Sequence, residues 1–268
     1  MNHFKLGRRA PLWTPAHMQK AHLMGKALGA LGVPPIASAD FVSAVTSLVG
    51  NKWGMMLKDT LGDCTAADTG HRDMIIKANT GTWTGVPTDA EIEAFYSATT
   101  GYNPANPATD QGGDESAIEE YLISHGFLGN RASATAMVAS GTIDMAACDK
   151  IRWAVQLFGG CRLGVNLPNS AEGQFDANVP WELTGDLTID GGHDVVAVKY
   201  DPRYLYVVTW GGQPGRPDGL TPVAWDWVMR FCEEAHGTIY RNFVMSSGLT
   251  PDGFNMDHLV RNLQALSV

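Results

Sequence analysis

The chain has 268 residues, a length that allows one large domain or two lobes around a shared interface. Hydrophobic residues make up 44% of the composition and charged residues 18%, a balance that excludes a largely disordered chain. The formal net charge of −9 and the lack of a basic run oppose binding to nucleic acid or to anionic membranes, because both need clustered Lys and Arg side chains.

The N-terminal basic cluster of Lys5, Arg8 and Arg9 is not followed by the apolar core of a secretion signal. No window approaches the roughly 18 consecutive apolar residues of a membrane helix. We therefore expect a soluble protein of a reducing compartment, cytoplasmic or virion-associated, with no membrane partner. The widely spaced cysteines are Cys64, Cys148, Cys161 and Cys232. They form no zinc-binding pattern, so neither a metal nor another cofactor is predicted.

The first 160 residues are predicted to be mainly helical. An extended segment over residues 1–13 leads to Thr14-Pro15, an N-cap followed by proline at the first helical position. Helices are predicted over residues 15–31, 64–78, 88–101, 114–126 and 144–158. Residues 36–56 are expected to be extended or irregular. The loop at 102–113 is rich in Pro, Asn and Gly, and a loop of this length in a compact domain is usually functional.

After Gly160 the pattern changes to short β-strands. Strands are predicted over residues 161–167, 195–200, 204–210 and 238–244, and helices over 221–234 and 257–266. Helices first and strands second favour an α+β fold over alternating β and α units. We expect an N-terminal extension (1–50), a helical lobe (51–159) and a β-rich lobe (160–268).

Cys64 follows a turn-rich stretch and begins a predicted helix. The unpaired N–H groups and the positive dipole end at that position favour a thiolate. The alternative is a buried, inert cysteine. A cysteine nucleophile needs a base within hydrogen-bond reach, and His193 is the candidate, because Gly191 and Gly192 leave its imidazole unobstructed at the start of a strand. His71, two helical turns after Cys64, is too distant and is interpreted as structural.

Other polar residues near these motifs are given no role. The carboxylates Asp63, Asp110, Asp190 and Asp194 are expected to be solvated in loops. Asp68, one helical turn after Cys64, would oppose a thiolate if it were ionised. Cys148 is interpreted as a core residue.

Five short motifs follow one another along the chain, at residues 58–64, 96–102, 109–112, 191–193 and 209–211. They read Lys-Asp-Thr-Leu-Gly-Asp-Cys, Tyr-Ser-Ala-Thr-Thr-Gly-Tyr, Thr-Asp-Gln-Gly, Gly-Gly-His and Thr-Trp-Gly. In this order the sequence resembles papain-like cysteine peptidases, and most of all a branch of uncharacterised bacterial and phage-encoded members. The separation of Cys64 from His193 is also close to the roughly 130–150 residues found in that family.

The resemblance implies a two-lobe fold with Cys64 as nucleophile and His193 as general base. Gly112 and Gly113 match the glycine pair that lets an extended peptide approach the cleft wall. Their alternative is a turn before a helix. Trp210 matches the tryptophan that shields the histidine, and its alternative is the buried end of a strand.

Three positions depart from the family pattern. Lys58 occupies the place of the Gln or Asn whose amide binds the oxyanion, so it is either a substitute donor or a solvated charge. Thr65 follows the cysteine, where papain-like enzymes have an aromatic residue. Val208 replaces the Asn that orients the histidine, which leaves Thr209 or Gln213 as the candidate orienting residue.

The leading hypothesis is a cysteine hydrolase that acts on a peptide or related amide bond, with a peptide or protein as its partner. Acyl transfer uses the same groups and stays open. A second hypothesis is an inactive papain-fold structural or binding protein, for example in a phage particle or at a host contact. A third is that residues 1 to about 50 form a propeptide, which predicts an N-terminal segment lying across Cys64.

Overall fold

The structure is a computed structural model that describes residues 4–11, 14, 15, 17–19, 22, 35–240 and 243. The helix predicted over residues 15–31 lies largely outside this part of the chain, and that predicted over 257–266 lies wholly outside it. No described helix is both long enough and apolar enough to cross a bilayer.

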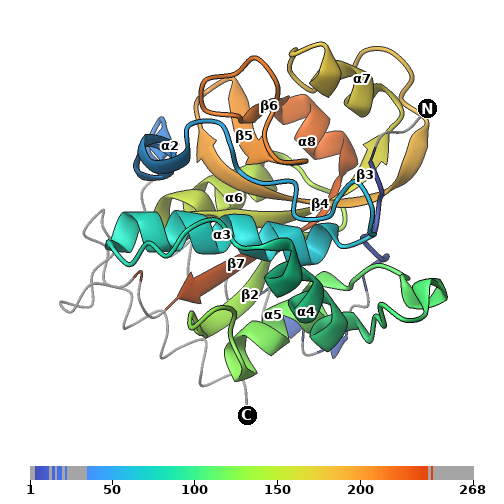
Figure 1. Cartoon of the computed structure of the whole chain (residues 1–268). Coiled ribbons are helices and arrows are strands. Elements are labelled where there is room, and N and C mark those ends of the chain that lie inside the picture. The colour runs from blue at the N-terminus through green and yellow to red at the C-terminus, as the bar shows by residue number, and fades with distance from the viewer. Residues whose placement is uncertain are drawn as a thin grey trace.

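An antiparallel sheet forms the centre of the fold (Figure 1). The strands are β1 (Ala39–Asp40), β2 (Ala132–Ser140), β3 (Cys161–Pro168), β4 (Ile189–Tyr200), β5 (Tyr204–Val208), β6 (Thr221–Ala224) and β7 (Cys232–Tyr240). Their order is β2-β7-β3-β4-β5-β6, with β1 paired to β4. The two central pairings of β3, with β4 and with β7, are antiparallel, as are the others between these strands.

Helices cover this sheet, so the fold is α+β, as the sequence predicts. They are α2 (Ser43–Val49), α3 (Cys64–Thr80), α4 (Asp89–Thr100), α5 (Glu115–Ser124), α6 (Met145–Phe158), α7 (Ser170–Asp176) and α8 (Trp225–Phe231), with a 3-10 turn, η1 (Pro107–Thr109). In Figure 1, α3 crosses the middle of the molecule, with α4 and α5 below it and β4, β5 and β6 above it. Helix α3 packs against β4, and α6 packs against β7 and β2.

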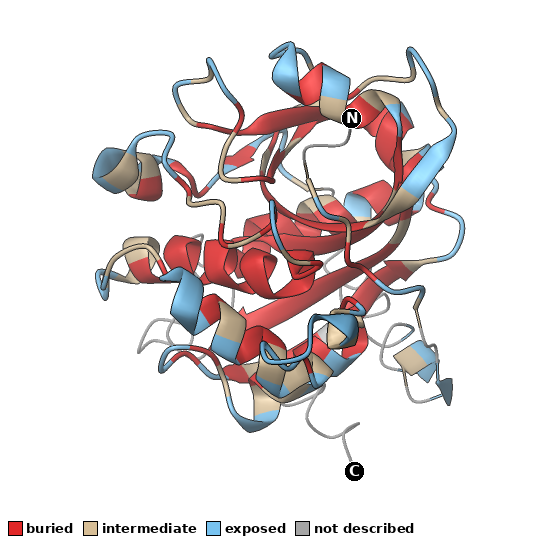
Figure 2. Ribbon diagram, turned by 45° about the vertical axis from the view of Figure 1, so that its right-hand side comes forward, coloured by how far each residue is buried: buried red, intermediate tan, exposed pale blue. Residues whose placement is uncertain are grey.

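Helix α3 is buried along almost its whole length, and Figure 2 shows it in red inside the surrounding elements. Its neighbour α4 is stabilised locally, because Thr88 and Glu91 form a reciprocal capping box at its N-terminus. The hairpin predicted between β4 and β5 is present, and the Asp201 side chain accepts bonds from the N–H groups of Arg203 and Tyr204, both at 2.7 Å.

Three local predictions are wrong. The stretch 36–56 contains α2, which lacks a capping side chain and packs on α3, so its helix depends on tertiary contacts. The region 221–234 is not one helix: Pro222 lies in β6, an edge strand where its missing N–H is tolerated, and α8 then ends before β7. Strand β2 precedes α6, so strands begin before Gly160, and β2 pairs with β7.

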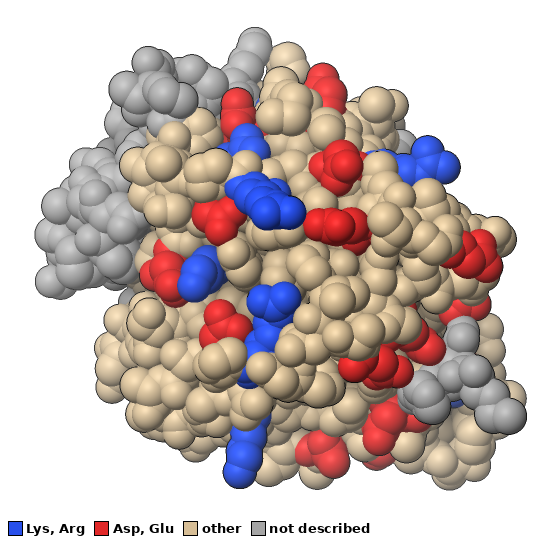
Figure 3. All heavy atoms as spheres, turned by 90° about the horizontal axis from the view of Figure 1, so that it is seen from above, with Lys and Arg blue, Asp and Glu red and all other residues tan. Residues whose placement is uncertain are grey.

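Acidic and basic side chains lie side by side over the face shown in Figure 3. Among the described residues drawn there, this face presents no continuous basic surface of the kind that phosphate contacts require.

Candidate active site

Cys64 is the first residue of α3 and is completely buried. Burial, and then the nearby charge of Asp194, raise the pKa of its thiol to about 12, while Lys58 and the backbone N–H groups of Asp194 and Gly7 act in the opposite direction. The helix N-terminus alone would favour a thiolate. In this structure burial outweighs it, so Cys64 holds its proton at neutral pH.

His193 lies in β4 and is also completely buried. Its Nε2 is 2.8 Å from Oγ1 of Thr209, and its ring stacks on Trp210 with centroids 5.0 Å apart. Burial, followed by the charge of Lys58, lowers its pKa well below the usual value, so the imidazole is neutral. Its Nδ1 has no hydrogen-bond partner. That nitrogen is therefore available for proton exchange.

Helix α3, which begins with Cys64, packs on β4, which carries His193. The backbone N–H of Asp194, the residue after His193, bonds to the Cys64 thiol. Cys64 and His193 are not hydrogen-bonded to each other in this state, since His193 Nδ1 is without a partner. The candidate nucleophile and the candidate base are therefore not engaged with each other in the folded chain.

Lys58 is completely buried, and its Nζ has no hydrogen-bond partner. Its charge lowers the pKa of Cys64 and of His193, which places the ammonium group within electrostatic reach of both. The interpretation of Lys58 as a solvated surface charge is therefore wrong. A buried ammonium with unused donors can bind an oxyanion.

Asp63, directly before Cys64, is buried with both carboxylate oxygens lacking hydrogen-bond partners. Burial raises its pKa to about 8, although Lys58 opposes the shift. Asp194 is also buried and paired with Arg162, and the side chain of Asp110 is covered by Lys5. The expectation that these three carboxylates are solvated is wrong, because tertiary contacts bury them.

Asp63→Asn is expected to stabilise the protein at pH 8 but not at pH 4. The folded-state pKa of Asp63 exceeds the unfolded value, so folded protein binds more protons in this window and stability is lost as pH rises through about 8. The neutral amide removes that loss, worth at least about 1 kcal/mol, or roughly 2–4 °C in Tm. Thermal melts at both pH values test this. A gain in Tm of equal size at pH 4 would contradict it.

Gln213 is excluded as the residue that orients His193. Its Nε2 donates to the carbonyl oxygens of Phe175 and Val179, at 3.4 and 3.2 Å, and its Oε1 accepts from Arg216. Val208 is a buried residue of β5. Of the sequence candidates, Thr209 alone contacts the imidazole.

Residues 4–9, here termed the cleft segment, lie along the site. Lys5 N–H donates to Lys58 O at 2.9 Å, and Arg8 N–H donates to Gly192 O at 3.1 Å. At one end of the segment, the ring of Phe4 stacks on Trp210 with centroids 4.4 Å apart. The segment therefore contacts the residues before Cys64, before His193 and after Thr209.

Gly112 and Gly113 receive the other side of the cleft segment. Gly113 N–H donates to Gly7 O at 2.8 Å, and Gly113 O accepts from Arg9 N–H at 2.9 Å. A Cβ on Gly112 would lie 1.9 Å from Gly7 O, and one on Gly7 would lie 1.8 Å from Gly62 O. An extended chain fits here because these positions carry no side chain.

Two further buried polar residues lie near the site. Arg162 was not singled out from the sequence, and His71 was expected to be structural. Arg162 lies in β3 and donates to Glu119 and to the backbone of Thr65, so it contacts the helix that carries Cys64. A lone charged residue, Arg162, within a mainly apolar strand was the available signal. His71 is buried beside Gly54, with Nε2 3.0 Å from its carbonyl oxygen, in agreement with a structural role.

Solved structures of cysteine proteases have a similar fold. Xylellain from Xylella fastidiosa matches with a TM-score of 0.59 and 14% identity, over 88% of this chain and 96% of that chain. Procathepsin L2 from the Tenebrio molitor larval midgut matches with a TM-score of 0.52 and 14% identity, over 89% of this chain and 84% of that chain. Procathepsin B S9 from Trypanosoma congolense matches with a TM-score of 0.52 and 11% identity, over 88% of this chain and 87% of that chain. The chain has the papain-like fold.

No family model and no curated protein sequence matches the chain. At these low identities the structural matches establish the papain-like fold and not an activity. The expected catalytic roles of Cys64 and His193 stay predictions. The contacts of the two residues indicate which atoms would take part, with His193 Nδ1 as the nitrogen that would exchange the proton.

Proposed function

We propose that the protein is a papain-like cysteine hydrolase that cleaves a peptide or related amide bond. One observation carries the proposal: an extended peptide, the cleft segment, lies against a cysteine at a helix N-terminus beside a histidine that Thr209 and Trp210 hold. Peptide, nucleophile and base are the components that acyl transfer requires.

In the proposed reaction, the Cys64 thiol transfers its proton to Nδ1 of His193. The thiolate attacks the carbonyl carbon, and Lys58 stabilises the negative charge that forms on the carbonyl oxygen. His193 then protonates the leaving amine as the C–N bond breaks. Water, deprotonated by His193, hydrolyses the acyl-thioester and restores the thiol. Thr209 holds the imidazole in position throughout.

The chain as folded is proposed to be an occluded form, with residues 1 to about 50 as a propeptide. The cleft segment presents the N–H of Gly7 to the Cys64 sulfur. The group facing the thiol is therefore a hydrogen-bond donor and not a carbonyl carbon that the sulfur could attack. It also excludes water, and burial in turn keeps the thiol protonated. Release of the segment is therefore the activating step.

The test uses the full chain with a specific protease site inserted after Ala10, which is exposed. Cleavage leaves every residue present but allows residues 4–9 to dissociate. Alkylation of Cys64 by iodoacetamide at pH 7.5, followed by mass spectrometry, is expected to be at least ~10-fold faster in cleaved than in intact protein. Cys161, buried in β3, is the internal control.

The cleaved protein is also expected to hydrolyse peptides, and Cys64→Ala to abolish that activity. Cleaved protein with no hydrolysis above the level of Cys64→Ala would refute the proposal. That outcome would favour the second candidate, an inactive binding module such as a phage-particle or host-contact component. The filled cleft and the apolar Val208 are the observations that favour the module.

A further inference from the structure

The side chain of Arg8 leaves the cleft segment and enters a pocket of carboxylates. Its Nε donates to Glu115 Oε1 at 3.0 Å, its Nη1 to Glu233 Oε2 at 3.0 Å and its Nη2 to Glu234 Oε1 at 2.6 Å. The arginine side chain is 1% exposed. Every nitrogen of the guanidinium therefore meets a carboxylate.

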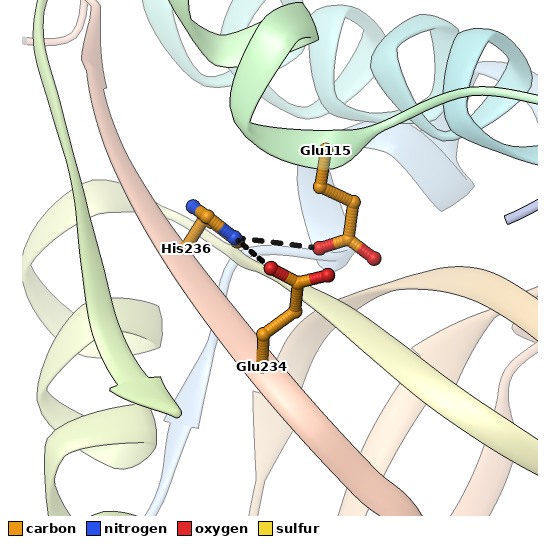
Figure 4. Close-up of side chains that lie close together, drawn as sticks. All are labelled: Glu115, Glu234 and His236. Atoms are coloured by element: carbon orange, nitrogen blue, oxygen red, sulfur yellow. Dashed lines mark hydrogen bonds and ion pairs between the residues drawn. The ribbon is translucent and has the colours of Figure 1, made fainter. Parts of the chain in front are cut away.

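The pocket belongs to the folded body and not to the segment. Glu115 begins α5, whereas Glu234 and His236 lie on β7, and Figure 4 shows these three side chains turned toward one another. Nε2 of His236 lies 3.0 Å from Glu234 Oε2 and fixes that carboxylate from the far side. Glu234 is thus held in position by a contact that does not involve Arg8.

Gly164 of β3 provides the space for the guanidinium. A Cβ at this position would lie 2.2 Å from Arg8 Nε and 2.3 Å from Glu115 Oε1. Neither approach is possible for any other residue without displacing the arginine. The pocket is shaped for a planar group as well as charged for a cation.

We propose that this pocket, formed by Glu115, Glu233, Glu234 and Gly164, is a specificity subsite that binds an arginine side chain of the substrate. The inference rests on the proposed peptide hydrolysis at Cys64. It names the substrate class as peptides or proteins with an arginine next to the residue that faces the thiol. In the occluded form, Arg8 occupies the subsite as an internal ligand.

The position of Arg8 along the segment fixes the distance from the chemistry. The preceding residue, Gly7, places its N–H at the Cys64 sulfur, and Arg8 N–H bonds to the carbonyl oxygen of Gly192, directly before His193. A side chain in the pocket therefore belongs to the neighbour of the residue at the nucleophile.

The charge of Glu234 favours a cationic occupant, whereas burial and then the nearby Asp194 and Glu234 raise the pKa of Glu115 well above its usual value, so Glu115 contributes an acceptor oxygen rather than a full charge. Glu234 is buried yet has a lowered pKa, because His236 and Arg8 offset the cost of burial, so it is ionised. Without an arginine, Glu233 loses its partner and Glu234 keeps only His236. An uncharged side chain would leave buried charge uncompensated, and lysine would supply one nitrogen where three are accommodated.

The experiment uses the cleaved full chain in a Cys64→Ala background, so that binding is measured without chemistry. A fluorescent peptide of sequence Phe-Lys-Leu-Gly-Arg-Arg-Ala-Pro is titrated against versions with citrulline or lysine at the fifth position. Citrulline keeps the shape of arginine and removes its charge. We expect affinity to fall at least ~30-fold with citrulline and ~10-fold with lysine.

Glu234→Gln and the partly exposed Glu233→Gln are expected to shrink the preference for arginine over citrulline. Glu93→Gln, on α4 away from the pocket, should leave it unchanged. Equal affinity for the arginine and citrulline peptides in folded protein would overturn the subsite. Arginine-selective binding without Cys64-dependent hydrolysis would refute the proposed function and leave the subsite standing, whereas hydrolysis without arginine preference would do the reverse.

Discussion

Replacing Lys58 by methionine is expected to lower kcat of the cleaved, opened protein by roughly 10²–10³, the loss seen when one oxyanion donor is removed. The Lys58 ammonium group is buried, has no hydrogen-bond partner in the resting state, and acts through its charge on the pKa of both Cys64 and His193. It therefore has donors to give to a charge that forms only during the reaction. Because the ground-state carbonyl carries little charge, KM should change much less than kcat.

Lys58→Gln provides a test of the donor role. An amide supplies N–H groups without charge, as in the family that the sequence resembles, so this variant should retain at least ~10-fold more activity than Lys58→Met. Lys52→Met, at an exposed position in the same region, is the matched control. Unchanged kcat in Lys58→Met, in protein that melts like wild type, would remove Lys58 from the mechanism.

The candidate nucleophile Cys64 and the candidate base His193 could be named from the sequence because their signals are local, and their catalytic roles stay predictions. A cysteine at a helix start and a histidine after two glycines are visible in short stretches, and the order of the motifs links them across the chain. The sequence offered two candidates for the residue that orients His193, Thr209 and Gln213. The structure shows Thr209 at the imidazole, whereas the Gln213 amide bonds to other groups. Side-chain direction in a loop after a strand cannot be derived from spacing.

The buried charges could not be predicted, since the burial of a charge depends on what the rest of the chain places around it. Asp63 and Asp194 look like loop carboxylates in sequence, yet both are completely buried in the folded chain. Strand β2 was missed for a related reason. Its small residues carry little β-propensity, and backbone pairing with β7 determines its conformation.

The cleft segment lies between these cases. Its extended conformation was predicted from the sequence, and an N-terminal segment across Cys64 was one of three open hypotheses. The structure places the cleft segment against Lys58, Gly113 and Gly192, around the site that contains Cys64. Processing of the segment is a proposal. The carboxylate pocket around Arg8 was not foreseen, because its members come from α5 and β7 and are distant in sequence.

Arg162→Met is expected to be the most destabilising of the substitutions considered. The guanidinium is completely buried and joins two halves of the site: it donates to Thr65 O at 3.0 Å and to Thr69 Oγ1 at 2.7 Å on α3, and it pairs with Asp194 on β4. Burial raises the pKa of Asp194 well above its usual value, and Arg162 is the main opposing charge. Methionine fills similar volume and leaves these carbonyl and carboxylate oxygens unpaired.

The expected loss is about 3–5 kcal/mol, the cost of removing one partner from a buried ion pair, or roughly 6–20 °C in Tm. Arg162→Lys retains the charge but not the planar fork, so it should fall between wild type and methionine. Arg203→Met, at a side chain 77% exposed, is the surface control and should stay within about 0.5 kcal/mol of wild type. Equal Tm values for Arg162→Met and Arg203→Met would show that α3 and β4 are held together without Arg162. If the loss is observed, the alignment of Cys64 with His193 depends on Arg162, which is distant from both in sequence. Arg162 acts on them through their neighbours, since it binds the residue after each of them.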